Sequence, residues 1–390
     1  MTLKTAARGI IPPFIVMEVL RRATELEQAG HAVRHLEVGQ PSTGAPRGVI
    51  EAAKRALDAD RLGYTEALGI RPLREAIAQH YADQYDVTIP AARIVVTTGS
   101  SGGFVLSFLA AFDPGDRVAL ASPGYPCYRH ILTGLGIEPV LLEAGPAERY
   151  QPNIALLEKA EREGGKLDGL ILASPSNPTG TMVTPEELQA LADYCHARGI
   201  RLISDEIYHG IGYGTVAEAT AAAFSDSAVV INSFSKYFSM TGWRLGWMVV
   251  PEDLARAIEC LAQNLFINAP TLSQIAGIAA FDCREELDGH VANYARSRAH
   301  LMKALPAAGI SDFLPPDGAF YIYADISRLT NDSRAFCAAL LEETGVACTP
   351  GMDFDEARGA HTMRFSFARK PDEIEDASGR LADWLKHRGQ

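Results

Sequence analysis

Short apolar runs alternate with helical patterns along most of the chain, beginning at about residue 46. The runs are rich in valine, isoleucine and leucine, and they lie at 94–98, 117–122, 169–174, 200–206, 228–235 and 244–250. Runs of this kind are typical of strands buried on both faces, and the segments between them suit helices that connect parallel strands. The pattern therefore predicts an α/β fold whose functional residues gather beyond the carboxyl ends of the strands.

One of the expected helices has a clearly marked start. Thr184 stands before Pro185 and three residues ahead of Glu187, which is the pattern of a capping box, and Gly199 lies where the helix should end. The pattern near the N-terminus also predicts a helix over roughly 15–29.

The pattern changes after about residue 290. A long helical stretch leads to apolar runs at 320–326 and 362–368, with a helical pattern near 332–344 between them. This arrangement predicts a smaller α+β lobe after the α/β part.

The length of 390 residues exceeds the usual size of a single core, so two domains are expected. The large domain should cover 44–290, and the small domain should combine 1–43 with 291–390. A cleft between two lobes is the default position for a ligand site.

Composition and charge exclude several classes of function. The chain has 36 Lys and Arg against 48 Asp and Glu, which gives a formal net charge of −12. An acidic chain repels phosphate backbones and anionic lipid, which disfavours a general nucleic-acid or membrane partner. No apolar run approaches the ~20 residues that span a bilayer, and no signal peptide is recognisable. We therefore predict a cytoplasmic protein.

The cysteines and histidines give no sign of a metal site. The six cysteines are scattered without a CxxC pair, which is neither a disulfide framework nor a zinc pattern and suits a reducing compartment. His31 and His35 could share a helix face, but no neighbouring ligands complete a set. No metal is expected.

The segment 232–246, NSFSKYFSMTGWRLG, carries the most informative chemistry. Lys236 follows a predicted buried strand, and a buried ammonium group is costly unless it is paired or neutral. Its pKa should therefore fall, which favours a nucleophile that forms a Schiff base with an aldehyde. Arg244, with Ser233 and Ser235, offers a charge-assisted phosphate site. Taken alone, a surface lysine and a structural arginine explain the segment equally well.

Three further segments follow predicted strands. Asp205 and Tyr208 lie in ISDEIY, Asn177 lies in the turn SPSNPTG, and Tyr125 lies in SPGYPCY. Asp205 could pair with a protonated ring nitrogen, Tyr208 could hydrogen-bond a ring oxygen, and Tyr125 could stack on an aromatic ring. Each has an ordinary alternative as a helix cap, a common turn or a packed tyrosine.

The segment TGSSGG at 98–103 follows a strand and opens a helical pattern. Its small residues, Gly102 included, would let backbone N–H groups and the hydroxyls of Ser100 and Ser101 approach a phosphate at the positive end of a helix. The segment is neither GxGxxG nor GxxxxGK, which disfavours dinucleotide and nucleoside-triphosphate sites. A tight strand–helix turn is its structural alternative.

Together these residues supply a Schiff-base lysine, a carboxylate for a ring nitrogen, donors to a ring oxygen, a stacking ring and a phosphate site. Among cofactors, only pyridoxal 5'-phosphate (PLP) needs all of them at once. From about Val38 to Arg364 the chain resembles the class I and II aminotransferases, PLP enzymes of fold type I. SFSKYFSMTGWRLG, SPSNPTG and SDEIY carry the resemblance in family order. It implies a type I PLP-dependent transferase fold, with a mostly parallel seven-stranded sheet in the large domain.

The resemblance also implies residue roles. Lys236 would form the internal aldimine and move the proton at the substrate α-carbon, while Asp205 keeps the ring nitrogen protonated. Tyr208 and Asn177 would bind the ring oxygen. The remaining expected cofactor contacts are Ser100, Ser101, Gly102, Tyr125, Ser233, Ser235 and Arg244, and the expected substrate contacts are Gly39, Asn177 and Arg364.

Tyr64, in GYTEALGIRPLREAI, resembles a tyrosine that reaches the cofactor phosphate of the neighbouring subunit. The resemblance thus implies a homodimer with shared active sites, and a tyrosine packed within its own chain is the alternative.

The expected reaction moves an amino group from an L-amino acid to a 2-oxo acid by a ping-pong mechanism. The turn GSSGG has no lysine and the N-terminal IIPPF is apolar, so a neutral or aromatic substrate side chain is favoured over a second carboxylate.

Three alternatives stay open at this point. A PLP-dependent C–S β-lyase or synthase would use the same lysine and aspartate. A ligand-sensing regulator would need a DNA-binding module, for which the chain has no room. A nucleotide-dependent α/β enzyme would need a glycine fingerprint that is missing.

Overall fold

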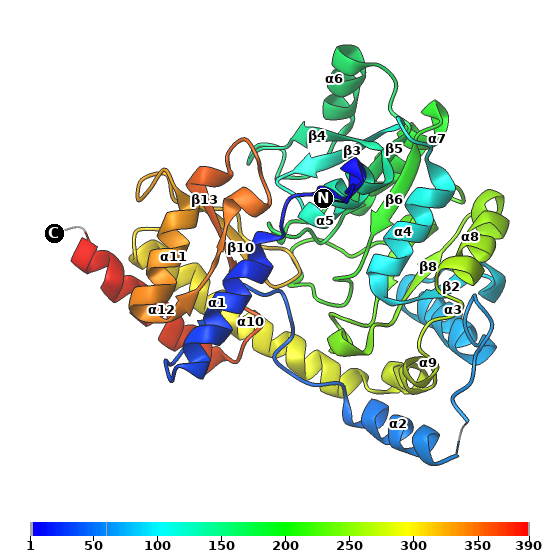
Figure 1. The fold of residues 1–390 in the computed structure, drawn as a ribbon, viewed down its shortest axis with the longest axis horizontal. Coiled ribbons are helices and arrows are strands. Elements are labelled where there is room, and N and C mark those ends of the chain that lie inside the picture. Colours follow the sequence, from blue (N-terminus) through cyan, green and yellow to red (C-terminus); the bar gives the residue numbers. More distant parts are fainter. Residues whose placement is uncertain (1–2, 60, 389–390) are drawn as a thin grey trace.

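The computed structural model describes residues 3–59 and 61–388. Its largest sheet has seven strands in the order β2-β8-β7-β6-β5-β3-β4 (Figure 1). The strands are β2 (Ile94–Thr97), β3 (Arg117–Ser122), β4 (Glu138–Glu143), β5 (Gly169–Ala173), β6 (Arg201–Asp205), β7 (Val229–Ser233) and β8 (Gly246–Val249). β8 runs antiparallel to both of its neighbours, and the other pairs are parallel. The predicted fold class is confirmed.

Helices cover both faces of this sheet. They are α2 (Arg47–Ala59), α3 (Arg71–Tyr85), α4 (Gly99–Ala111), α5 (Pro126–Leu135), α6 (Ile154–Gly164), α7 (Pro185–Arg198), α8 (Glu252–Leu265) and α9 (Thr271–Ile278). Successive residues of β5 point into different cores, because Leu170 and Leu172 join one apolar cluster while Ile171 joins another. This two-sided burial is the reason that the strands are continuous apolar runs.

The predicted capping box is present at the start of α7. The Thr184 hydroxyl accepts the Glu187 N–H at 3.2 Å, and the Glu187 carboxylate accepts the Thr184 N–H at 2.7 Å. Gly199 ends the helix at φ +66°, a left-handed conformation that glycine adopts without a steric penalty.

The second group of elements contains an antiparallel sheet in the order β12-β13-β10-β9. Its strands are β9 (Asp312–Phe313), β10 (Tyr321–Asp325), β12 (Thr349–Pro350) and β13 (Thr362–Ser366). The helices α10 (Arg284–Ala307), α11 (Ser333–Thr344) and α12 (Pro371–Arg388) accompany it. Short 3₁₀ turns lie along the chain at Ala7–Gly9, Ala91–Arg93, Ala221–Ala223, Thr241–Trp243, Ala279–Asp282, Gly351–Asp353 and Gly359–His361.

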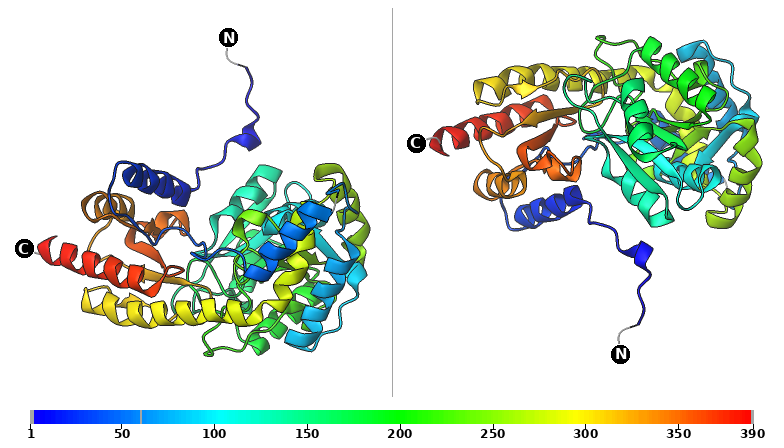
Figure 2. Two further views of the ribbon diagram at one scale, coloured as in Figure 1. Left: turned by 90° about the horizontal axis from the view of Figure 1, so that it is seen from below. Right: turned by 90° about the horizontal axis from the view of Figure 1, so that it is seen from above.

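The N-terminal segment joins this second group. β1 (Arg34–His35) pairs in parallel with β11 (Val346–Ala347), and α1 (Ile15–Gln28) packs near β11 and β12. Ahead of α1 the chain runs out from the second group of elements (Figure 2), and its 3₁₀ turn Ala7–Gly9 lies close to α5. α10 is continuous through residue 290, so the expected domain boundary falls inside a helix, and the division into two domains stays a prediction.

Within the described residues, no helix is long and apolar enough to cross a membrane.

Candidate active site

A pocket of about 220 Å³ lies where the parallel strands end, between the large sheet and the second group of elements. Most of the residues predicted for the site line its wall: Gly39, Ser100, Ser101, Tyr125, Asn177, Tyr208, Ser235, Lys236, Arg244 and Arg364. They come from segments far apart in sequence, which the sheet topology brings together at one edge, as expected for an α/β fold.

Lys236 lies in the turn after β7 and points into the pocket. Its Nζ donates to the backbone carbonyl of Gly39 at 2.7 Å and stands 5.6 Å from the centre of the Tyr208 ring. Burial and the positive charge of Arg364 lower the pKa of Lys236 to about 8. A lysine with this pKa is substantially neutral in mildly alkaline solution, and the neutral form is the nucleophile.

Asp205 ends β6 beneath the pocket wall and is almost completely buried. The Tyr128 hydroxyl donates to Oδ2, and the Ile207 N–H donates to Oδ1 at 3.1 Å. Burial raises the pKa of Asp205 to about 6, while these two donors oppose the rise. A carboxylate that is costly to ionise in isolation is well suited to pairing with a nearby cation.

Tyr208 and Asn177 both line the pocket, and each has a hydrogen-bond partner in the second group of elements. The Tyr208 and Tyr321 hydroxyls are 2.7 Å apart. Asn177 Oδ1 accepts from Nη1 of Arg364 at 2.8 Å, which leaves its amide N–H groups free to donate elsewhere. Burial raises the pKa of Tyr208 well above its ordinary value, so the phenol is a hydrogen-bond donor at neutral pH.

Arg364, on β13, is the buried cation of the second group of elements. Its Nη2 donates to the Glu37 carbonyl and to the Thr349 hydroxyl, and the guanidinium lies 4.5 Å from the centre of the Tyr321 ring. Within the described part of the chain, its Nε has no hydrogen-bond partner. A buried N–H without a partner is costly, and an incoming carboxylate would satisfy it.

Arg244 lies beside the N-terminus of α4. Among the residues described there, no side chain caps the first turn of α4 and no acidic residue stands in it. Gly99 has φ +66°, which favours glycine, and a Cβ there would lie 2.6 Å from Nη2 of Arg244, so glycine leaves room for the guanidinium at the helix start. Free N–H groups, the hydroxyls of Ser100 and Ser101 and an arginine together form a typical anion site.

Besides Asp205, three predicted cofactor residues do not line the pocket. Ser233 is buried, and its hydroxyl donates to the Ser235 hydroxyl at 2.9 Å, so it orients Ser235 instead of facing the pocket. Gly102 is buried within α4. Tyr64 is 89% exposed on the loop between α2 and α3. The roles of these residues stay predictions.

The N-terminal segment supplies an apolar part of the wall. Phe14, Val16 and Met17 line the pocket, and Phe14 packs edge-on against Tyr125 with ring centroids 5.8 Å apart. Of the apolar segment IIPPF, only Phe14 lines the pocket, and Ile10 and Ile11 are exposed. The Asp353 carboxylate accepts the N–H groups of Ile15 and Val16, at 3.0 and 3.1 Å, and thereby fixes the start of α1.

Sequence reasoning missed Tyr128, Tyr321 and Asp353. Tyr128 stands three residues after Tyr125 in the same motif, and Tyr321 lies in a predicted strand, so both segments had been recognised without these roles. Tyr321 also explains Gly39, because a Cβ there would lie 1.6 Å from the Tyr321 hydroxyl. Within the described part of the chain, no group of three or more His, Cys, Asp and Glu side chains could hold a metal ion.

Comparisons with known proteins show the family to which this chain is similar. The family model described as aminotransferase class I and II matches residues 33–381. The chain is 50% identical to a valine–pyruvate aminotransferase from Mycobacterium tuberculosis, over 99% of each chain. It is 31% identical to an aspartate aminotransferase from Bacillus subtilis, over 98% of this chain and 99% of that protein.

Solved structures match over nearly the whole chain. A crystal structure of an aminotransferase from Mycobacterium tuberculosis gives a TM-score of 0.96 at 50% identity, covering 99% of this chain and 100% of that one. The aspartate aminotransferase from Thermus thermophilus with maleate gives 0.91 at 30% identity, covering 98% and 100%.

Proposed function

Because the chain belongs to the class I and II aminotransferase family, we propose that it uses PLP to move an amino group from a neutral, apolar L-amino acid to a short 2-oxo acid. The chain is an aminotransferase, and its substrates are an amino acid and a 2-oxo acid. The observation that carries the narrower proposal is the apolar wall formed by Phe14, Val16 and Met17.

The residues of the pocket fit PLP. Its phosphate would bind at the start of α4, where uncapped N–H groups, two serine hydroxyls and Arg244 gather without an acidic neighbour. Asp205 would face the ring nitrogen and Tyr125 would contact the ring, with Lys236 between the two ends. The donor set therefore matches an anion at one end and a protonated ring nitrogen at the other.

When bound, PLP would supply an aldehyde that accepts the amino group and a conjugated ring that withdraws electrons from the substrate α-carbon. Lys236 would hold the aldehyde, and its neutral amine would take the proton from the substrate α-carbon and deliver it to the carbon that bears the amino group at the end of the half-reaction. Its lowered pKa suits both tasks, because a general base works best near the operating pH.

Asp205 would stabilise a proton on the ring nitrogen by its charge, and the Tyr128 hydroxyl holds its carboxylate in place. Tyr208 and the amide N–H groups of Asn177 would donate to the ring oxygen. Arg364 would bind the substrate α-carboxylate, with Nε as one of the donors.

The side-chain end of the pocket favours neutral substrates. The cations that this chain contributes to the wall are Lys236, Arg244 and Arg364, and each already has a role in the proposal. A second carboxylate would therefore be buried without a partner, at a cost of several kcal/mol. The relative at 50% identity carries the name valine–pyruvate aminotransferase, which supports a branched apolar donor and a short acceptor.

The test is a spectral titration of the PLP-loaded protein with single amino acids. Valine, leucine and alanine should convert the cofactor absorption to that of the amine form, whereas aspartate should leave it unchanged. Adding pyruvate should then restore the original spectrum, as a ping-pong mechanism requires. Preference for aspartate would overturn the substrate proposal, and release of ammonia without conversion would overturn amino transfer as the main reaction.

We further propose a homodimer in which Tyr64 enters the partner's site. In support, Tyr64 is almost fully exposed. Further exposed apolar side chains lie on α2 (Ile50 and Leu57) and at the end of α8 (Leu265 and Ile267). Exposed apolar surface can mark a protein interface.

A further inference from the structure

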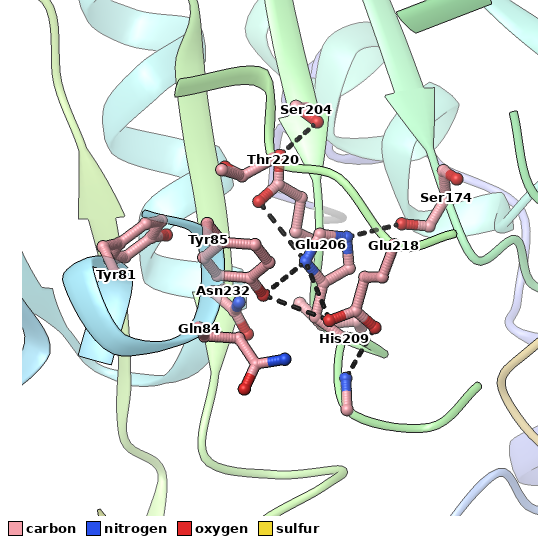
Figure 3. Close-up of polar contacts among 12 residues, drawn as sticks. Tyr81, Gln84, Tyr85, Ser174, Ser204, Glu206, His209, Glu218, Thr220 and Asn232 are labelled. Atoms are coloured by element: carbon pink, nitrogen blue, oxygen red, sulfur yellow. Dashed lines mark hydrogen bonds and ion pairs between the residues drawn. The ribbon is translucent and has the colours of Figure 1, made fainter. Parts of the chain in front are cut away.

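A buried polar cluster lies behind β6, outside the pocket that holds the candidate site (Figure 3). Its members are Glu206, His209 and Glu218, together with Tyr85 from α3. Glu206 and His209 alternate in sequence with the site residues Asp205 and Tyr208, so one turn of chain serves both the pocket and the cluster. The proposed reaction assigns no role to these four residues.

His209 is the centre of the cluster and is 6% exposed. Its Nε2 lies 3.1 Å from the backbone carbonyl of Ser174, and its Nδ1 lies 2.8 Å from the Tyr85 hydroxyl. The carboxylates of Glu206 and Glu218 stand 3.6 and 3.9 Å from the same Nδ1.

One hydrogen-bond direction of His209 is fixed by its partner. Nε2 must donate, because the Ser174 carbonyl can only accept. The Tyr85 hydroxyl lies 2.8 Å from Nδ1 and 3.3 Å from Oε1 of Glu218, so it links the imidazole to that carboxylate. Among the described residues, Oε2 of Glu206 has no hydrogen-bond partner, and it stands 3.6 Å from the same Nδ1. The nearby His80 stays neutral at physiological pH, since burial lowers its pKa to about 4.

The two nitrogens of His209 connect the loops that carry the ring-oxygen donors. Ser174 begins the turn that leads to Asn177, and Tyr208 precedes His209 directly. On the other side, Glu218 accepts the Gly210 N–H at 2.7 Å, which fixes the chain beyond His209. Movement of His209 would therefore displace Asn177 and Tyr208 relative to each other.

We propose that His209 is a positioning residue that fixes Asn177 and Tyr208 against the ring oxygen of the cofactor, by linking the Ser174 carbonyl to Tyr85 and Glu218. The inference rests on the proposed function, because it concerns the residues assigned to bind PLP there. It implies that His209 acts on the electronic state of the cofactor without touching it.

Two substitutions separate the links of His209. In His209→Gln the amide nitrogen replaces Nε2 and can still reach Ser174, whereas in His209→Asn it replaces Nδ1 and the Ser174 link is lost. The measurement is the pH at which the absorption band of bound PLP changes. Hydrogen bonds to the ring oxygen lower this midpoint, so His209→Asn should raise it by about one pH unit, and kcat/KM should fall about tenfold. His209→Gln should lie closer to the wild type.

The exposed His196, on α7, provides the matched control. His196→Asn removes a histidine that contacts Ser227 and should leave the midpoint unchanged. A midpoint in His209→Asn equal to that of the wild type, in protein with wild-type thermal stability, would overturn the inference.

A second measurement, rescue by imidazole, is used if His209→Asn folds poorly. The cluster borders a cavity of about 230 Å³, so imidazole added to His209→Ala has room to enter. Imidazole should return the spectral midpoint toward the wild-type value, and failure to do so in folded His209→Ala would count against the inference. If the wild type itself showed no cofactor band, the proposed function would fail and not the role of His209.

Discussion

Lys236 holds an ammonium group in a pocket that also contains Arg364, and both burial and this like charge favour the neutral amine. With its pKa at about 8 instead of 10.5, the ligand-free protein should capture PLP at a rate that rises with pH and levels off above about pH 8. The measurement is borohydride trapping followed by peptide mapping.

Lysines on the surface, such as Lys54, serve as internal standards in the same maps. As the pH is raised, the trapped fraction at Lys236 should reach its maximum while that of the surface lysines still increases. Lys236→Ala should lose the adduct and more than about 10³-fold of the turnover. A rate at Lys236 that kept rising to pH 10.5 would show that its amine is not activated.

Asp205 predicts a pH dependence of stability in the ligand-free protein. Its pKa is about 6 when folded and 3.8 ordinarily, so between these values the folded chain binds more protons than the unfolded chain. The stability supplied by the proton is complete below pH 3.8 and is lost as the pH rises to about 6. Asp205→Asn cannot ionise and keeps its stability throughout this range.

From pH 4 to 6 the free energy of unfolding of the wild type should therefore fall relative to that of Asp205→Asn, by up to about 3 kcal/mol. Above pH 6 the difference between the two proteins should stay constant. Thermal unfolding across this pH range measures it. The exposed Asp226→Asn controls for loss of a carboxylate as such. A difference that does not change with pH would contradict the burial argument.

At the scale of elements, α1 depends on a carboxylate from elsewhere in the chain. Phe14, at its N-cap position, offers no side-chain acceptor, and Asp353 accepts the first N–H groups instead. Asp353→Ala should cost about 1 kcal/mol of stability as a lost cap. Because α1 carries Val16 and Met17 into the pocket, KM for valine should rise about tenfold while kcat changes less.

Asp332→Ala separates the two effects of the lost cap. Asp332 caps α11 through the Ala335 N–H at 3.0 Å, at a helix start that does not line the pocket. The Asp332→Ala substitution should lower the free energy of unfolding by a similar amount and leave KM for valine unchanged. An equal rise of KM in both variants would mean that lost stability, and not the position of α1, affects binding.

The elements also show what the sequence could predict. Interior strands such as β5 and β6 were recognisable because burial on both faces makes them continuously apolar. β4 was missed, since it lies at the sheet edge and is mostly half-buried or exposed. The capping box of α7 was recognisable because its hydrogen bonds join residues three apart.

The site likewise contains features that the sequence predicts and contacts that it does not. Lys236, Asp205 and Asn177 lie in contiguous motifs and could be predicted from them. The Tyr128–Asp205 and Tyr208–Tyr321 hydrogen bonds join residues 77 and 113 positions apart, and only the packed fold brings them together. Local sequence therefore predicted the candidate reactive groups, whereas the partners that shift their pKa values are set by tertiary structure.

At the scale of the whole molecule, the proposed shared site predicts that two impaired variants restore activity when their subunits are combined. In a mixed dimer of Lys236→Ala with Tyr64→Ala, one site receives both defects. The other site combines the intact Lys236 of one subunit with the intact Tyr64 of its partner. Tyr64→Ala alone should bind PLP more weakly, because one donor to the phosphate is lost.

The two variants would be mixed, dissociated and reassociated, then assayed with valine and pyruvate. Random exchange should give about half mixed dimers, each with one intact site, and so about a quarter of the wild-type activity. Parallel mixing of Lys236→Ala with Asp205→Asn is the control, since both defects lie in the same subunit's site and each site of a mixed dimer keeps one of them. Activity no greater than the sum of the separate variants would place Tyr64 outside the partner's site.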